Sequence, residues 1–174
     1  MKRMIDPFAY APQILNALKK GVLLTVKDGD KLNTMAIGWA HLGIEWNTPT
    51  FVAYVRGCRH TKPILDATGE FTVNIPLGEV DKNIIRVCGT KSGRDTDKFA
   101  LLGLTPEAPE KISVPGIRQL PLTLECKVIY RQQQTPQCVL DEHIYTHYEH
   151  PCPDVEQDYH TVYYGQILSA YIIE

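Results

Sequence analysis

The strongest constraint on the fold is an Asp28-Gly29 pair that stands between two extended stretches. Residues 22–26 are apolar and β-branched in character, and an extended pattern resumes at Leu32. An Asp-Gly pair in this setting is typical of a β-hairpin, whose two strands are antiparallel. The sequence therefore predicts an antiparallel sheet that begins near the N-terminus. A short helix over 9–20, ended by Gly21, precedes it.

The second strand of this hairpin contains an uncharged segment, Asn33-Thr34-Met35-Ala36-Ile37-Gly38-Trp39, with small residues at Ala36 and Gly38. Small side chains let a ligand approach the backbone N–H and C=O groups of a strand closely. We interpret the segment as a central strand of the sheet, along which a flat, hydrogen-bonding ring lies. A buried strand interrupted by a glycine bulge is the alternative interpretation.

Further extended segments alternate with turn signals along the rest of the chain. The sequence predicts a turn at 47–49, a helix over 79–87, an irregular proline-rich crossing over 104–121, and strands over 50–56, 70–76, 122–134, 138–150 and 160–173. Evenly spaced antiparallel strands with few helices predict a mainly β fold, a small barrel. A length of 174 residues suits one domain over 1–174.

Basic side chains gather around a helix that is expected to begin after the strand over 50–56. Arg56, Arg59, His60 and Lys62 flank Thr61, the expected helix cap. The free N–H groups and the dipole of a helix N-terminus favour an anion, so this cluster predicts a phosphate site, a solvated group of charges being the alternative. The polar loop over 88–95 can add backbone donors and cations, although it lacks the spacing of a P-loop.

Charge and composition exclude several classes of function. A net charge of -2 and a pI near 6.3 argue against nucleic acid as the main partner. No apolar signal region and no apolar run of membrane-spanning length is found, so we expect a cytoplasmic protein without a membrane partner. The five cysteines are irregularly spaced, which favours thiols over a disulfide framework. The G-x-G-x-x-G fingerprint of a Rossmann crevice is absent.

A metal site is not predicted, although His143, His147, His150, Cys152 and His160 suggest one at first sight. On a strand, His143 and His147 would lie about 13 Å apart at roughly 3.3 Å per residue. Two nitrogens that each lie about 2 Å from one zinc ion must be much closer than that. His160 alone could be a polar residue at the start of a strand.

Taken in order, these segments resemble the flavin reductase-like family of FMN-binding split β-barrels, which includes NAD(P)H:FMN oxidoreductases and flavoredoxins. The resemblance extends over almost the whole chain. The matching segments are Gly21 to Thr25, Asn33 to Ala36 with Trp39, Thr48-Pro49, Val55-Arg56 with His60-Thr61, Glu70 to Asn74, Ser92-Gly93 before Asp97 to Phe99, and His160 with Gly165.

The resemblance implies a mainly β, antiparallel split β-barrel with a few short peripheral helices. It implies a homodimer with FMN near the subunit interface, the ring lying along the strand and the phosphate held after it. His160 is assigned to orienting the reductant. The cofactor-binding residues implied are Asn33, Thr34, Met35, Ala36, Trp39, Arg56, Arg59, His60, Thr61, Asn74, Ser92 and Gly93.

The activity implied is that of an FMN-dependent oxidoreductase, which passes a hydride from NADH or NADPH through FMN to a free flavin, a metal complex or another acceptor. Two alternatives stay open. One is a flavoredoxin-type electron-transfer flavoprotein that a partner protein reduces, and the other is a non-enzymatic FMN carrier. Many family members have Gly-Asp before the histidine, whereas Asp158-Tyr159 precedes His160 here.

Overall fold

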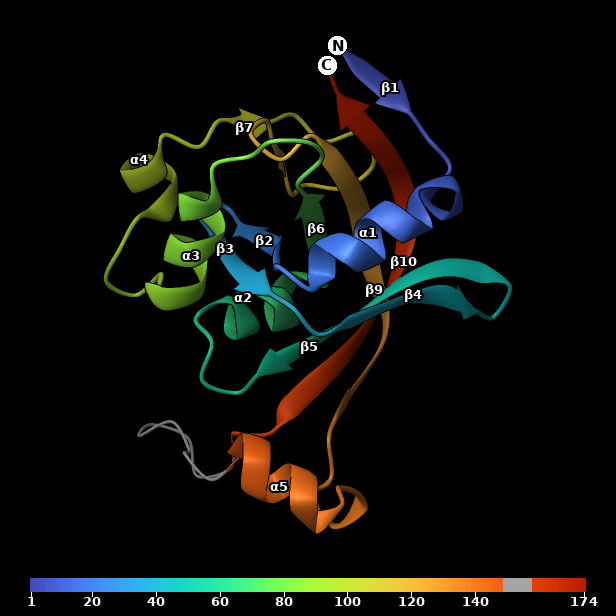
Figure 1. Ribbon diagram of the computed structural model, residues 1–174, viewed down its shortest axis with the longest axis vertical. Coiled ribbons are helices and arrows are strands. Elements are labelled where there is room, and N and C mark those ends of the chain that lie inside the picture. Colours follow the sequence, from blue (N-terminus) through green and yellow to red (C-terminus); the bar gives the residue numbers. More distant parts are fainter. Residues whose placement is uncertain (149–157) are drawn as a thin grey trace.

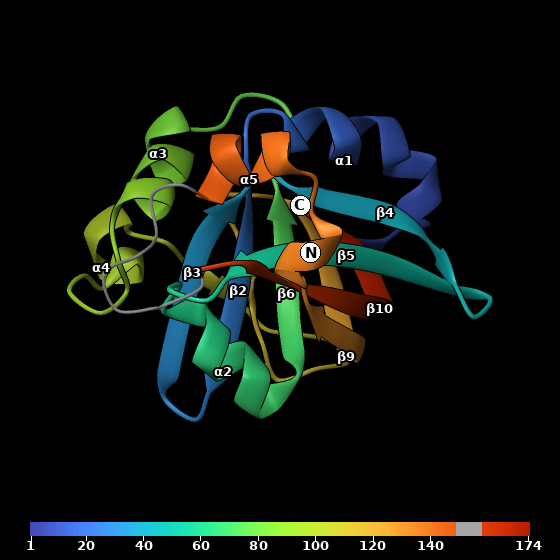
Figure 2. The same ribbon diagram turned by 90° about the horizontal axis from the view of Figure 1, so that it is seen from below.

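One antiparallel sheet dominates the computed structural model, which describes residues 1–148 and 158–174 (Figure 1). Its strands follow the order β3-β2-β6-β9-β10-β5-β4, and β1 pairs with β10. The strands are β1 (Lys2–Met4), β2 (Val22–Asp28), β3 (Lys31–Ile37), β4 (Ala40–Glu45), β5 (Thr48–Arg56), β6 (Glu70–Ile75), β9 (Leu122–Gln133) and β10 (His160–Ile173). In Figures 1 and 2 the sheet curves into an open barrel, which confirms the mainly β fold.

Short helices lie outside this sheet. α1 and α3 turn their apolar faces toward the strands, burying Ile14 and Leu18 in one case and Ile84, Val87 and Cys88 in the other. No helix among residues 1–148 and 158–174 is long and apolar enough to cross a membrane. The helices are η1 (Pro7–Tyr10), α1 (Ala11–Leu18), α2 (Thr61–Thr68), α3 (Lys82–Thr90), α4 (Lys98–Leu102), η2 (Pro136–Cys138) and α5 (Asp141–Tyr148).

The core of the barrel depends on a close approach at Gly165. A Cβ atom at this position would lie 2.4 Å from Cζ of Phe71 and 2.9 Å from Cβ of Cys126, and both of these residues are fully buried. A larger residue in place of Gly165 would push the Phe71 ring out of a close-packed interior. The glycine is therefore explained by packing and not by a ligand.

The structure places β3 at an edge of the sheet, so the prediction of a central strand is wrong. Among the described residues β3 pairs with β2 alone. The two-residue loop Gly29-Asp30 sets Asp28 opposite Lys31 as a hydrogen-bonded pair. Hydrogen-bonded and non-hydrogen-bonded pairs alternate along an antiparallel hairpin, so Thr34 and Ala36 form non-hydrogen-bonded pairs with β2. The backbone N–H and C=O groups of Thr34 and Ala36 therefore point away from β2, toward the open edge.

The turn expected at 47–49 is also misplaced. The chain turns at Trp46 and Asn47, whose φ angles are 48° and 57°, as the two central residues of a type I′ turn require. Thr48 and Pro49 belong to β5, and β4 was not predicted, because no clear alternation marks residues 40–45. The β4–β5 hairpin extends away from the barrel in Figure 2.

The strand expected over 138–150 is wrong, because most of the described part of this range forms α5. Asp141 and Glu142 in the first turn and His147 in the last suit the dipole of a helix. The rings of His143 and His147 stack with centroids 6.2 Å apart, so the distance argument against a metal site fails. No cluster of three or more potential ligands is found among the described residues, which do not include His150 and Cys152.

The helix expected over 79–87 is confirmed with a shift toward the C-terminus. α3 begins after Asp81, whose side chain accepts a hydrogen bond from the Asn83 N–H (2.8 Å). Residues 104–121 are irregular, as predicted, apart from a small sheet made by β7 (Pro106–Glu107) and β8 (Gly116–Ile117).

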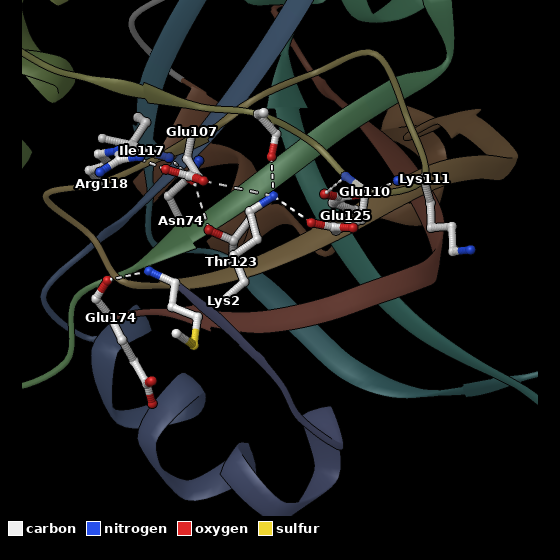
Figure 3. Close-up of polar contacts among 12 residues, drawn as sticks. Lys2, Asn74, Glu107, Glu110, Lys111, Ile117, Arg118, Thr123, Glu125 and Glu174 are labelled. Atoms are coloured by element: carbon white, nitrogen blue, oxygen red, sulfur yellow. Dashed lines mark hydrogen bonds and ion pairs between the residues drawn. The ribbon is translucent and has the colours of Figure 1, made fainter.

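A polar network joins the two chain ends to the irregular crossing (Figure 3). Glu125, which is fully buried in β9, accepts hydrogen bonds from the backbone N–H groups of Glu110 and Lys111, both at 2.7 Å. Lys2 Nζ lies 2.7 Å from Glu110 Oε1 and 4.6 Å from the centre of the Tyr171 ring. The network therefore satisfies a buried carboxylate and holds β1 and residues 104–121 against the sheet.

Candidate functional site

Two cavities adjoin along the second half of β3. The larger cavity measures about 400 Å³ and lies between the end of β3, the end of β5 and the start of β10. The second, which we call the cationic cavity, measures about 190 Å³ and lies between β3, the start of α2 and the loop that follows α3. Met35, Ala36 and Arg59 line both cavities, so the two can hold different parts of one ligand.

The larger cavity has one backbone wall and one aromatic wall. Ala36 on the open edge of β3 and Gly38 just after the strand carry little or no side chain, so a ligand can reach the backbone groups there. Trp39, Tyr54 and His160 line the cavity as well, and the rings of Trp39 and His160 lie 5.0 Å apart. This arrangement suits a flat molecule with hydrogen-bonding groups along one edge.

His160 is the first residue of β10 and is only 6% exposed. Its Nδ1 atom lies 2.7 Å from the hydroxyl group of Tyr148 in α5. Burial lowers the pKa of His160 to about 4, with the charge of Arg56 acting in the same direction and that of Asp158 against it. The imidazole is therefore neutral at pH 7.

Arg56 has a different position from the one predicted, because it lines the larger cavity and not the cationic one. Its guanidinium lies 3.4 Å from the Asp158 carboxylate, donates to the backbone carbonyl of His147, and covers the ring of Tyr148 at 5.4 Å. These contacts join β5 to α5 and to the start of β10. Arg56 therefore helps to build the wall of the larger cavity.

The cationic cavity contains a buried lysine, Lys98, which is only 4% exposed. Among the described residues no carboxylate pairs with it, and its one hydrogen bond is a long one of 3.4 Å to the Lys91 carbonyl. Burial lowers the pKa of Lys98, and the nearby Arg59 adds to this effect. Because a buried, unpaired charge is costly, an anionic ligand group would complete this site.

The loop after α3 meets β3 and the residue before α2 at Gly93, which lines the same cavity as this lysine. A Cβ atom on Gly93 would lie 2.3 Å from Asn33 Oδ1 and 2.8 Å from His60 Cδ2. Asn33 in turn donates a hydrogen bond to Thr61 Oγ1 (2.8 Å). Thr61 is the first residue of α2, and His60 occupies the cap position expected for it. Burial lowers the pKa of His60, and Arg94 and Lys98 lower it further. Asn33 thus connects β3 to the start of α2.

Most predicted site residues line one of the two cavities, but Thr34 and Asn74 line neither. Thr34 is buried and lies 3.0 Å from the hydroxyl group of Thr25. Asn74 donates to Thr25 and accepts from the Ile117 N–H, so it holds the interior together. The residues that line a cavity are Asn33, Met35, Ala36, Trp39, Arg56, Arg59, His60, Thr61, Ser92, Gly93 and His160.

Sequence reasoning missed several residues at these cavities. Lys98 lines the cationic cavity and Tyr54 lines the larger one, while Lys91 and Arg94, which also line the cationic cavity, belong to the loop over 88–95 from which cations were expected. Tyr148 contacts His160 from a segment that was expected to be a strand. The signal available for Lys98 was its place in Asp97-Lys98-Phe99, directly after the polar loop.

Comparison with known proteins gives consistent matches. Residues 17–174 match the family model described as the flavin reductase like domain. An uncharacterized protein of Archaeoglobus fulgidus is 26% identical over 145 residues, covering 83% of this chain and 68% of that protein. The flavoredoxin of Desulfovibrio vulgaris (Miyazaki F) superposes with a TM-score of 0.66 at 25% identity, covering 88% of this chain and 69% of that one.

A second solved structure extends the likeness to nearly the whole chain. The FMN-binding domain of a flavin reductases-like enzyme from Shewanella baltica OS155 superposes with a TM-score of 0.64, covering 99% of this chain and 77% of that one, at 14% identity. At this identity the likeness concerns the fold alone, and it supports the expected split β-barrel architecture.

Proposed function

The chain belongs to the family of flavin reductase-like domains, and from this premise we propose that it is an FMN-dependent oxidoreductase. In this proposal it uses NADH or NADPH as the reductant and a flavin or another small molecule as the acceptor. One observation carries the proposal: a cavity along an open strand edge continues into a cavity with a buried lysine that has no carboxylate partner in the described part of the chain. This arrangement matches a molecule with a flat ring at one end and an anion at the other.

The larger cavity fits the ring of FMN. Ala36 lines this cavity, and its backbone N–H and C=O groups face the open edge of β3, as those of Thr34 do one pair earlier on the same edge. There they could pair with the ring's nitrogens and carbonyl oxygens. Backbone N–H groups fixed in this way favour negative charge, so they would stabilise a reduced ring without any catalytic side chain. Bound FMN would supply the redox chemistry, taking up a hydride and passing on electrons.

The cationic cavity fits the phosphate of FMN. Lys98, Arg59 and Arg94 place three cations around it, and the loop at Gly93 approaches closely enough that a Cβ atom would collide with Asn33. A charge-assisted hydrogen bond contributes on the order of 1.5–3 kcal/mol. Two such bonds from these side chains would make FMN a tightly held cofactor.

The test begins with the visible spectrum of the purified protein and a titration of its flavin-free form with FMN. Oxidation of NADH and NADPH is then measured with FMN present. We expect binding and turnover with at least one nucleotide. Ala36→Leu should weaken FMN binding, since Ala36 lines both cavities, whereas Ala67→Leu on the exposed side of α2 should not. Absence of FMN binding would refute the proposal.

A flavoredoxin-type role is the second candidate, and the 25% identity to a flavoredoxin favours it. This candidate predicts tight FMN binding, slow reaction with NADH and NADPH, and fast reduction by a low-potential protein donor. If FMN binds and every donor fails to reduce it, the protein is a non-enzymatic carrier.

We also propose that the protein acts as a homodimer with FMN near the subunit interface. The β4–β5 hairpin extends from the barrel and carries two large apolar side chains, Ile44 and Trp46, which are 68% and 67% exposed. Apolar side chains exposed together on a projecting element are typical of an interaction surface. Light scattering should give twice the chain mass, and Trp46→Glu should shift the protein toward the monomer and weaken FMN binding.

A further inference from the structure

A chain of hydrogen bonds leads from Gln134, directly after β9, through Tyr148 of α5 to His160 at the larger cavity. The Tyr148 hydroxyl group lies 2.8 Å from Gln134 Oε1 and 2.7 Å from His160 Nδ1. A phenol has one proton to donate, and the amide oxygen of Gln134 can only accept it. The hydroxyl oxygen must then accept a hydrogen bond from His160, so Nδ1 carries the imidazole proton.

A neutral imidazole has one N–H group, so protonation of Nδ1 leaves Nε2 as a bare acceptor. Nε2 has no hydrogen-bond partner among the described residues. The fully buried polar atoms without a partner do not include Nε2, so this atom is not fully buried. It therefore reaches open space, and His160 lines the larger cavity. In the proposed function a second substrate would lie in this cavity beside the flavin ring, where a bare Nε2 could accept a hydrogen bond from it.

We infer that Tyr148 and Gln134 are positioning residues, which fix His160 in the tautomer that presents a bare Nε2 to the larger cavity. This inference rests on the proposed FMN-dependent function, and it defines the chemistry of the second substrate. The group placed at His160 must be an N–H donor, as in the primary carboxamide of a reduced nicotinamide. A carboxylate or carbonyl oxygen at this position would meet a lone pair and be rejected.

The surroundings of His160 keep its ring neutral, with a single N–H group, over the pH range of an assay. Arg56 and Arg59 disfavour a second proton on the ring, Asp158 favours one, and His147 packs nearby from α5. With the pKa of His160 near 4, the ring stays neutral above about pH 5. The direction of the hydrogen bonds along Gln134, Tyr148 and His160, and not the charge of the imidazole, then decides which substrate group His160 can bind.

The direct test uses nitrogen NMR of protein labelled with ¹⁵N-histidine, with the His160 signals assigned by their loss in His160→Asn. At pH 7 we expect a protonated Nδ1 and a bare Nε2. Tyr148→Phe should shift the ring toward the other tautomer. Tyr145→Phe, the same change at an exposed residue of α5, should leave the spectrum unchanged. Gln134→Glu should keep the Nδ1–H form, because a carboxylate only accepts hydrogen bonds.

The kinetic test measures KM and kcat for the better reduced nicotinamide with FMN saturating. Tyr148→Phe should raise KM about three- to tenfold, the range that corresponds to one net hydrogen bond. It should change kcat and FMN affinity little, whereas Tyr145→Phe should change none of the three.

A protonated Nε2 in the unmodified protein would overturn the inference, since the amide of Gln134 would then donate and the chain would run in reverse. An unchanged tautomer in Tyr148→Phe would overturn it too. The NMR result does not depend on turnover, so a protein that fails to oxidise NADH and NADPH would refute the proposed reductant while leaving the tautomer to be judged by itself.

Discussion

Replacing Lys98 by methionine should change stability and cofactor affinity in opposite directions. The lysine is 4% exposed and has no carboxylate partner among the described residues, so the flavin-free protein carries the cost of a poorly compensated buried charge. Methionine fills a similar volume without the charge. We expect Lys98→Met to raise the free energy of unfolding of the flavin-free form by about 1–3 kcal/mol.

The same substitution removes a charge-assisted hydrogen bond to the cofactor's phosphate. Such a bond contributes on the order of 1.5–3 kcal/mol, and each 1.4 kcal/mol is tenfold in affinity, so FMN should bind roughly 10- to 150-fold more weakly. Urea unfolding of the flavin-free protein measures the first effect, and quenching of flavin fluorescence measures the second. Lys20→Met, at an exposed position after α1, serves as the control.

Two results would refute this reasoning. If Lys98→Met lowers the stability of the flavin-free protein, the lysine has a structural partner, and its charge is already compensated without a ligand. If FMN affinity is unchanged while Lys20→Met behaves in the same way, the phosphate binds elsewhere. Opposite changes in stability and affinity are typical of residues placed for function.

Three further predictions follow from the same contacts. The pKa of His160 is about 4 in the folded protein and about 6.5 in the unfolded chain, so between these pH values the unfolded chain binds more protons. The stability that neutral His160 contributes is therefore complete above pH 6.5 and is lost as the pH falls toward 4. The loss amounts to up to about 3 kcal/mol. His160→Asn should flatten this dependence in urea titrations at pH 7 and 4.5, and equal slopes would contradict it. Glu125→Gln should lower the free energy of unfolding by about 1–3 kcal/mol by leaving a buried N–H group without an acceptor, whereas exposed Glu110→Gln should have a smaller effect. Gly93→Ala should weaken FMN binding at least tenfold by displacing Asn33, whereas Gly43→Ala, with open space around its Cβ position, should not; equal affinities would argue against a cradle at Gly93.

The sequence by itself determined the features that depend on neighbours along the chain. The Asp28-Gly29 pair predicted the first hairpin, since a turn is a local signal, whereas the two-residue loop Gly29-Asp30 and the backbone groups of β3 that it turns outward came from the structure. The cluster of cations near Thr61 indicated an anion site, because a helix start is a local signal. The resemblance added the order of these pieces and located most residues that line the two cavities.

Only the tertiary structure decided which of these residues act together. No local pattern distinguishes an edge strand from a central one, since that depends on pairing with distant segments, and β3 was misplaced for this reason. Lys98 is a functional candidate only because packing buries it beside Arg59, and no carboxylate in residues 1–148 or 158–174 pairs with it. The packing of α5 against the start of β10 brings together Gln134, Tyr148 and His160. The helix itself could not be predicted, because the apolar residues of α5 do not recur with a clear helical periodicity.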